Sequence, residues 1–382
     1  MIKSIDMQNY KSIVDLKLEL GRVNVIIGAN GTGKINILEA ISVVSAASLG
    51  RFEEEYLGRR IRWTEPEFMI SELELDEEDE NTNLDKFIRI VVNPSEGMSI
   101  PCLLYYNQEN KEWVDFGSEI KIDNAIEFIK NIGNNKGNTF YEQMERIVEQ
   151  NDNVTDFTNL VKELSSTNNS EGVNKIPVTV SRLNQALHRK KSLDSFITYA
   201  PEESYLRQFS IDSQIKPFGR KGEGLFKHLK ELMTDEDTRI TIINALNDGL
   251  SLLDWFKELK IPEDLFAQEN RLDITDRFLK ESAQVFDEKS TNEGFLYLLF
   301  YLVLFNSPKA PVFFAIDNIE TSFNPKLTTE FVRHIIKLAQ ANNRQVIITT
   351  HSPFVLDGLD LSDDEQRLYV VRRNIDGHTK LN

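Results

Sequence analysis

Apolar and polar residues alternate through the first twenty positions of the chain, which is the pattern of half-buried β-strands. Apolar side chains occupy every second position from Leu16 to Leu20. The mostly apolar run VNVIIG at 23–28 ends in glycine, as buried parallel strands commonly do. From Asn36 to Ser48 the apolar positions return at helical spacing. The sequence therefore predicts a strand, a glycine-rich loop and a helix in succession.

The remaining predicted elements fall into three groups along the chain. Strand-like stretches follow the first helix, at 67–75, 86–92 and 102–108. The middle is predicted to be mainly helical, with helices within 122–170 and at 181–191, 224–233 and 237–258. From 275 onward strands and helices alternate again, with a helix through 295–305, a strand at 311–317, a helix at 325–342 and a strand at 345–351.

This order predicts an α/β head with a mixed sheet, whose two halves are separated by an insertion. We expect the N-terminal half at 1–104, a mainly helical insertion that also serves dimerisation at 105–274, and the C-terminal half at 275–382. The most apolar stretch, at 295–305, is too short to cross a bilayer, so it predicts a buried helix. Met1 is followed by a strand pattern, so neither a signal peptide nor a membrane partner is expected.

The charge of the chain lowers the expectation of nucleic-acid binding without excluding it. The net charge is −17, and phosphate affinity comes mostly from Lys and Arg. Basic clusters nevertheless occur at 58–63, 188–191 and 218–224, so DNA stays a possible partner that the charge does not indicate. The single cysteine, Cys102, excludes an internal disulfide and fits a reducing cytoplasm.

The loop between the first buried strand and the first helix carries a phosphate-binding pattern. GANGTGK at 28–34 matches G-x-x-x-x-G-K, whose backbone amides and lysine cradle phosphates. Ile35 stands where the pattern has Ser or Thr, the hydroxyl that holds Mg²⁺. The residues expected to contact a nucleotide are Asn30, Gly31, Thr32, Gly33, Lys34, Ile35 and Asn36.

Two polar residues end buried strands near the C-terminus. Asp317 follows the strand at 311–317, where a carboxylate reaches Mg²⁺ directly or through water. His351 ends the strand at 345–351 and is placed to contact a γ-phosphate. Taken singly, Asp317 reads equally well as a helix cap and His351 as a strand-end histidine. Their order after a phosphate loop favours a nucleotide site.

These motifs together carry a resemblance to a known family. NYKSIVDL, VNVIIGANGTGKINILEA, FFAIDNIETSFNP and VIITTHSPFVLD resemble the ABC-type ATPases of the RecF/SMC/OLD group. The chain is most similar to the compact AAA-family ATPases of bacterial anti-phage systems, such as Septu-like or PARIS-like ATPase subunits. YAPEESYLRQF and KPFGRKGEGLFKHL also resemble segments that such proteins carry. The resemblance implies an ABC/SMC-type P-loop head that binds ATP and Mg²⁺.

The resemblance further implies a homodimer or higher oligomer. In this group two heads pair head to tail around two nucleotides, and a signature segment of one head contacts the nucleotide of the other. The matching residues here are Asn292, Glu293 and Gly294. They depart from the usual Ser-x-Gly, but the amides at a helix N-terminus still suit a phosphate.

A second departure concerns hydrolysis. The family often has a glutamate directly after the Walker B aspartate, and Asn318 stands there. Glu320 lies two residues further on and is the carboxylate that could replace it. Asp317, Glu320 and His351 are thus the candidate catalytic residues, and we expect binding with slow turnover. Ile35 is either native or an introduced change, since Ser and Ile codons differ by one base.

Several functions remain open. The resemblance implies an ATPase that gates a separate effector, a nuclease or a toxin, in anti-phage defence. A RecF-like DNA-repair ATPase is an alternative, although the net charge argues against it, and a zinc hook is excluded by the single cysteine. A catalytically dead scaffold that holds ATP fits the two departures. A transporter cassette does not fit the long insertion between the motifs.

Overall fold

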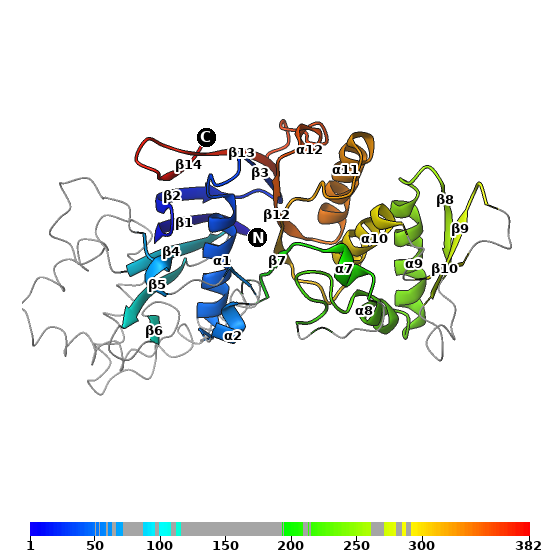
Figure 1. Ribbon diagram of the computed structural model, residues 1–382, viewed down its shortest axis with the longest axis horizontal. Helices are drawn as coiled ribbons and strands as arrows, with labels where there is room; N and C mark the ends of the chain where they lie inside the picture. Colours follow the sequence, from blue (N-terminus) through cyan, green and yellow to red (C-terminus); the bar gives the residue numbers. More distant parts are fainter. Residues whose placement is uncertain are drawn as a thin grey trace, which may run out of the picture. The chain divides into compact units, whose positions relative to one another are not determined.

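The computed structural model describes two compact units, each of which is treated by itself. The described residues are 1–49, 51–52, 54–58, 60–62, 66–71, 87–95, 99–107, 112–115, 193, 195–208, 213, 215–260, 271–279, 285–287 and 292–382. Unit 1 consists of the described parts of Met1–Leu20, Asn36–Asp194 and Arg372–Asn382. Unit 2 consists of the described parts of Gly21–Ile35 and Ser195–Val371 (Figure 1). The helices predicted within 122–170 and at 181–191 lie outside the described residues.

Unit 1 is built on an antiparallel sheet with the strand order β2-β1-β4-β5-β6. The alternation seen in the sequence is confirmed, because Ile5 and Met7 of β1 are fully buried. The hairpin between β1 and β2 turns at Lys11, which has a positive φ of 50°. The strands are β1 (Ile2–Tyr10), β2 (Ile13–Glu19), β4 (Phe87–Pro94), β5 (Ile100–Asn107) and β6 (Glu112–Asp115).

Helix α1 (Lys34–Ser48) begins in unit 2 and continues in unit 1. Two short helical turns follow in unit 1, α2 (Glu54–Leu57) and η1 (Pro66–Met69). The strand predicted at 67–75 is wrong in its first part, because 67–69 form η1. Pro66 fixes its own φ and lacks an amide donor, which favours such a turn over a ladder. Within the described residues 66–71, Ile70 pairs in sheet fashion, through a bridge to Tyr10.

The sheet of unit 2 is parallel, with β13, β3, β12, β11 and β7 adjacent in that order. Its central strands are buried on both faces, which explains their continuous apolar sequences. The last two residues of β13 belong to unit 1, as does β14 (Thr379–Leu381), which lies against β2. The strands are β3 (Val23–Ile27), β7 (Thr198–Tyr199), β11 (Phe313–Ile316), β12 (Gln345–Thr350) and β13 (Gln366–Arg373).

The core of unit 2 is centred on α10 (Glu293–Asn306). Every residue from Phe295 to Phe305 is buried, so the prediction of a core helix at 295–305 is confirmed. Each large apolar side chain buried in this way stabilises the fold by about 1.5–3 kcal/mol. A Cβ on Gly249 would lie 2.2 Å from Leu302, so glycine allows the close approach of α9 to α10. The other helices are α7 (Glu203–Leu206), α8 (Leu225–Leu232), α9 (Glu236–Leu250), α11 (Pro325–Ala341) and α12 (Pro353–Leu356).

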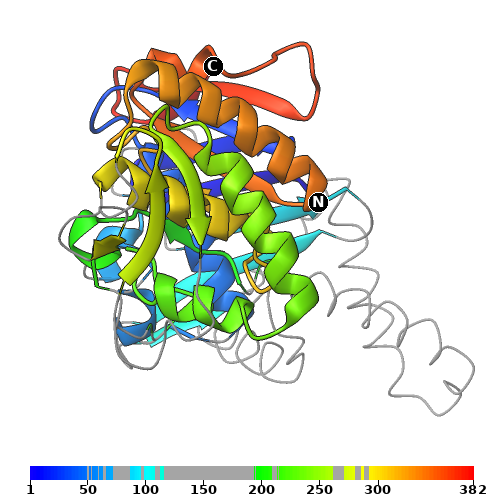
Figure 2. The same ribbon diagram turned by 90° about the vertical axis from the view of Figure 1, so that its right-hand side faces the viewer.

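The region 105–274 contributes strands as well as helices. The helix predicted at 237–258 ends at Leu250, because the chain turns there and enters β8 (Phe256–Lys260). β8 belongs to a three-stranded antiparallel sheet, with β9 (Arg271–Asp276) and β10 (Val285–Asp287), that lies beside α9 (Figure 2). Nowhere in the described ranges is a helix both long and apolar enough to cross a membrane.

Candidate functional site

The candidate site lies at the carboxyl ends of the parallel strands of unit 2. Ile27 of β3 is in register with Thr350 of β12, and Ile316 of β11 is in register with Ile348. The phosphate loop therefore leaves β3 beside His351, and Asp317 leaves β11 beside Thr349. Parallel α/β sheets bind ligands at this edge. Three motifs that are far apart in the sequence thus meet at one place.

The phosphate loop has the backbone conformation that its glycines allow. Gly31 and Gly33 have positive φ angles of 76° and 107°, which residues with a side chain rarely adopt. A Cβ on Gly28 would lie 2.5 Å from the carbonyl oxygen of Val371, so only glycine fits there. The loop ends where α1 begins at Lys34, so its amides sit at a helix N-terminus that suits an anion.

Lys34 is folded back onto its own loop. Its Nζ donates to the carbonyl oxygens of Gly28 at 2.7 Å and Ala29 at 3.0 Å. Burial lowers the pKa of the Lys34 ammonium from its ordinary value, while the carboxylates of Asp317 and Glu320 oppose that shift. The ammonium and the two carboxylates therefore share one electrostatic environment. Such an ammonium is suited to a phosphate that replaces the carbonyl contacts.

Asp317 is oriented by the neighbouring strand. The hydroxyl of Thr349 donates to Oδ1 of Asp317 at 2.5 Å, and the amide of Asn318 donates to the same hydroxyl at 3.1 Å. Asn318 has a positive φ of 51°, and its Oδ1 is buried without a hydrogen-bond partner in the part of the chain that the structure describes. An amide at this position cannot accept a proton from water.

Glu320 is oriented by the last residue of β12 and by the residue that follows it. The hydroxyl of Thr350 donates to Oε2 of Glu320 at 2.8 Å, and the amide of His351 donates to Oε1 at 2.8 Å. The carboxylate therefore lies at the strand end where the phosphate loop starts. His351 itself is exposed, so its ring is accessible to a ligand at this edge.

The signature residues begin α10 and contact the loop after Asp317. Asn292 is the exposed N-cap of α10, and its Oδ1 accepts from the amide of Phe295. The hydroxyl of Ser322 donates to Oε1 of Glu293. A Cβ on Gly294 would lie 3.4 Å from the carbonyl oxygen of Ser322. The signature end of α10 is therefore tied to the same loop that carries Glu320.

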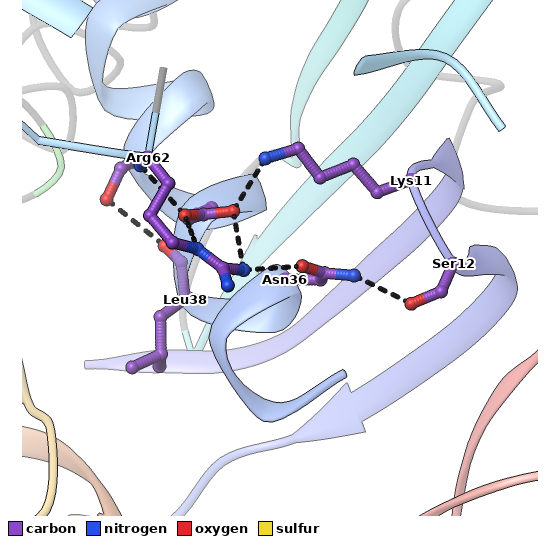
Figure 3. Close-up of polar contacts among 7 residues, drawn as sticks. Lys11, Ser12, Asn36, Leu38 and Arg62 are labelled. Atoms are coloured by element: carbon purple, nitrogen blue, oxygen red, sulfur yellow. Dashed lines mark hydrogen bonds and ion pairs between the residues drawn. The ribbon is translucent and has the colours of Figure 1, made fainter. Parts of the chain in front are cut away.

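Two of the predicted loop residues face different surroundings. Ile35 is half-buried in the first turn of α1 and offers only an alkyl chain. In unit 1 the Asn36 amide donates to the Ser12 hydroxyl at 2.7 Å, and its oxygen accepts from Arg62 at 3.0 Å (Figure 3). The side chain of Asn36 is thus already used to hold the start of α1.

A buried ionic cluster holds the rest of α1 in unit 1. Glu39 accepts hydrogen bonds from Lys11 and from both the amide and the guanidinium of Arg62 (Figure 3). Burial alone would raise the pKa of the Glu39 carboxyl, but the bonds from Arg62 and the charge of Lys11 outweigh it and lower the pKa. Glu39 therefore stays ionised and joins α1 to two other segments of unit 1.

The side chains present fit a magnesium nucleotide better than a bare metal ion. Among the described residues no group of three or more His, Cys, Asp or Glu side chains could hold a metal. Mg²⁺ is commonly held by one or two carboxylates together with phosphate oxygens and water. Asp317 supplies such a carboxylate, while Ile35 supplies no oxygen. The donor set therefore suits Mg²⁺ that arrives with a nucleotide, and holds it with one ligand fewer than usual.

The sequence indicated the acidic residues and the histidine but not the groups that orient them. Thr349, Thr350 and Ser322 were not singled out. Two adjacent hydroxyls at the end of an otherwise apolar strand were the available signal, since a buried hydroxyl needs a partner. Which partner each hydroxyl has depends on strand register, and the sequence alone does not show it.

Comparison with known proteins connects this geometry to a family. The family model described as "AAA domain, putative AbiEii toxin, Type IV TA system" matches residues 23–357. A segment of 65 residues is 42% identical to the DNA replication and repair protein RecF of Bacillus cytotoxicus. That match covers 17% of this chain and 17% of the RecF chain.

Two solved structures are similar over the whole chain. The Smc head bound to the C-winged helix domain of ScpA has a TM-score of 0.53 and 15% identity, covering 100% of this chain and 96% of that one. The SMC head domain from Thermotoga maritima has a TM-score of 0.49 and 14% identity, covering 100% and 98%. At 15% identity the first likeness shows the fold alone.

The chain belongs to the AAA-domain family whose model it matches over most of its length. The predicted fold class, an ABC/SMC-type P-loop ATPase head with a mixed α/β architecture, is confirmed. The resemblance to ATPases of the ABC, SMC and RecF type is confirmed as well.

Proposed function

We propose that this chain is a nucleotide-binding ATPase subunit that closes with a second copy around ATP and gates a separate effector in anti-phage defence. The observation that supports the nucleotide part is the register of unit 2, which brings the phosphate loop, Asp317 and His351 to one sheet edge. No other grouping of loop, carboxylate and histidine at strand ends occurs among the described residues of that sheet.

Each residue of the site has a role in this proposal. The amides of Asn30 to Lys34 and the Lys34 ammonium hold the phosphates, with Thr32 close to them. Asp317 would hold Mg²⁺, which neutralises phosphate charge when it is bound. His351 would contact the γ-phosphate, and Glu320 would accept a proton from the attacking water.

Turnover is proposed to be slow. Ile35 removes a metal ligand from the first turn of α1, and Asn318 removes the carboxylate expected after Asp317. Glu320 remains as a second carboxylate beside Asp317, and both oppose the lowering of the Lys34 pKa. ATP binding therefore lasts longer than in a fast ATPase, which suits a protein that signals by its bound state.

Pairing of two copies would complete the site. In this proposal the signature residues do not contact the nucleotide bound by their own copy. Instead, the exposed Asn292 and the amides around Gly294 would contact the γ-phosphate of the nucleotide bound by the second copy. Two-fold symmetry satisfies both sites at once. The region 105–274 is proposed to add contacts for dimerisation or for a higher oligomer.

The defence role and the effector rest on the family. The matched family description names the AbiEii toxin and a type IV toxin–antitoxin system, which supports a link to a toxin or another effector. The similar Smc head was solved with a domain of ScpA bound, so heads of this fold can carry a protein partner. We place the protein in the cytoplasm, where the thiol of Cys102 stays reduced.

A DNA-repair role is the second candidate, and the segment that matches RecF favours it. Measuring the affinity of the isolated protein for DNA at several salt concentrations distinguishes the effector-gating role from the DNA-repair role. An effector-gating subunit with a net charge of −17 is expected to bind DNA weakly at physiological salt. Tight binding that weakens steeply with salt would favour the repair role.

The nucleotide part is tested by titrating a fluorescent ATP analogue into the parent and into Lys34→Ala, with Lys326→Ala as a control at an exposed lysine of α11. We expect Lys34→Ala to lose binding and the control to keep it. Equal binding by Lys34→Ala would overturn the site.

Light scattering in the presence of ATP tests the pairing of two copies. Gly294→Glu should lower the measured molecular mass, because the new carboxylate would lie against a phosphate and weaken the pairing.

A further inference from the structure

We propose that Thr350 is a positioning residue that orients Glu320 as the acceptor of the proton from the attacking water, while Thr349 separately orients Asp317. The inference rests on the proposed ATPase function and deepens it. It assigns to Thr350 the orientation of Glu320, the carboxylate that would replace the one missing at Asn318, and to Thr349 the orientation of Asp317.

Both threonines are fully buried. The Thr349 hydroxyl accepts from the amide of Asn318 and donates to Asp317. The Thr350 hydroxyl accepts from the amide of Ser352 at 2.9 Å and has two acceptors within reach, Oε2 of Glu320 at 2.8 Å and the carbonyl oxygen of Ser352 at 3.5 Å. The shorter of these two contacts directs its proton to Glu320. Chains of this kind polarise each bond in turn and hold the final acceptor firmly.

The two threonines serve different carboxylates because they are neighbours in a strand. Consecutive side chains of a strand point to opposite faces. The loop from Asp317 to Glu320 crosses the end of β12, and the positive φ of Asn318 lies in that crossing. Asp317 consequently accepts from Thr349, and Glu320 accepts from Thr350.

The partners of Glu320 leave its charge available. A carboxylate offers about four acceptor sites, and the Thr350 hydroxyl and His351 amide occupy one on each oxygen. Both donors are neutral, so they fix the orientation without neutralising the anion. A free lone pair remains on each oxygen for the proton of a water molecule.

The reaction step is a displacement at phosphorus. The water oxygen forms a bond to the γ-phosphorus while the bond from that phosphorus to the β,γ-bridging oxygen breaks. ADP leaves with the electron pair of that bond, and one water proton passes to Glu320. The proton is later released to solvent, so the products are ADP, inorganic phosphate and one proton.

The test is a double-mutant cycle on single-turnover ATP hydrolysis, with ATP affinity measured on the same samples. Thr350→Val removes the hydroxyl at nearly constant volume, and we expect the rate constant to fall about tenfold or more, the value of a hydrogen bond to a charged group. ATP affinity should change less than about threefold, because Thr350 is fully buried and its hydroxyl bonds to Glu320. Thr350→Ser should restore most of the rate.

The double-mutant cycle shows whether Thr350 affects the rate through Glu320. In a Glu320→Gln background, Thr350→Val should cause almost no further loss. Thr349→Val should instead raise the Mg²⁺ concentration needed for half-maximal rate. Thr328→Val is the matched control, because Thr328 is also buried and donates to a backbone oxygen, that of Asn324, away from the site. It should leave the rate unchanged.

The outcomes separate this inference from the proposed function. A full rate in Thr350→Val, or an equal further loss in the Glu320→Gln background, overturns the positioning role while leaving the ATPase in place. Thermal unfolding of each variant identifies a loss of fold, and rescue by Thr350→Ser excludes it. Absence of hydrolysis in both the parent and Ile35→Ser, with ATP bound, overturns the ATPase function and this inference with it.

Discussion

Two carboxylates, one in each unit, are held in opposite ways. Glu39 of unit 1 is buried and paired with two cations, Lys11 and Arg62. Glu320 of unit 2 is partly exposed and accepts from neutral donors, the Thr350 hydroxyl and the His351 amide. A carboxylate that is neutralised by cations is committed to the fold. A carboxylate that neutral groups orient keeps its charge for a ligand or a proton.

The two units therefore differ in how the loss of the carboxylate affects the stability of the fold. In unit 1 the loss of the Glu39 carboxylate would leave Lys11 with its side chain 12% exposed and no partner of opposite charge in the cluster. In unit 2 the change of Glu320 to Gln would leave two neutral partners. The amide oxygen can still accept from the His351 amide, and the Thr350 hydroxyl can accept from the amide nitrogen. The first change is therefore costly to stability, and the second is costly only to chemistry. Four experiments test this difference.

The largest expected effect is on stability in unit 1. Glu39→Ala should lower the free energy of unfolding by about 3 kcal/mol, because it leaves the largely buried Lys11 ammonium without its carboxylate partner. Guanidinium unfolding measures this change. Glu19→Ala is the control, since Glu19 makes an exposed ion pair with Lys17 that is worth less than about 1 kcal/mol. Equal effects of the two substitutions would show that the cluster is not structural.

The matching experiment in unit 2 concerns rate. Glu320→Gln should lower the rate constant of hydrolysis about 100-fold, or about 2.7 kcal/mol, because an amide cannot accept the proton. The free energy of unfolding should change by less than about 1 kcal/mol. Single-turnover hydrolysis and guanidinium unfolding on the same samples provide both values. A stability loss as large as that of Glu39→Ala would erase the contrast between the two carboxylates.

His228 is a third titratable group that can be compared with the two carboxylates. It is buried, and no strong counter-charge holds it in its charged form. Burial lowers the pKa of His228 to about 4, against the opposing effect of Glu231. His228 bonds to the buried hydroxyl of Ser307 at 2.7 Å. The unfolded chain takes up a proton near pH 6.5 and the folded chain does not, so stability is present above that pH and is lost as the pH falls toward 4.

This contribution should amount to about 2 kcal/mol between pH 7 and pH 5. Unfolding by urea at the two pH values measures it, and His228→Gln should reduce the pH dependence by that amount. The window lies above the range in which Glu39 titrates, since the pKa of Glu39 is lowered from 4.5. An identical pH dependence in parent and variant would contradict the assignment to His228.

The smallest expected effect concerns the metal at the phosphate loop. Ile35→Ser supplies a hydroxyl oxygen where an alkyl chain now stands, and should raise Mg²⁺-dependent hydrolysis at least tenfold, about 1.4 kcal/mol. Ile35→Val is the matched control and should change little. If Ile35→Ser gives no gain in rate, the proton acceptor limits turnover and the metal does not. The slow rate is then due to Glu320, which acts in place of a carboxylate at Asn318.

Most elements that carry the site were predictable from the sequence. The strand–loop–helix at 23–48, the core helix α10, and strands β11 and β12 all have patterns that depend only on neighbouring residues. The predictions failed where a local pattern was ambiguous. Pro66 turned an expected strand into η1, and α9 ended at Leu250, before the end predicted at residue 258.

By itself the sequence determined the presence and order of the phosphate loop, Asp317, Glu320 and His351, because each follows a strand that its own residues specify. Only the tertiary structure decided which group orients which. Thr349 reaches Asp317 and Thr350 reaches Glu320 because β11 and β12 lie in one particular register, and a shift of one residue would reverse the faces. Glu39 and its two cations likewise come from three segments that meet only after the chain has folded. Contacts between residues distant in sequence depend on packing, which no local pattern records.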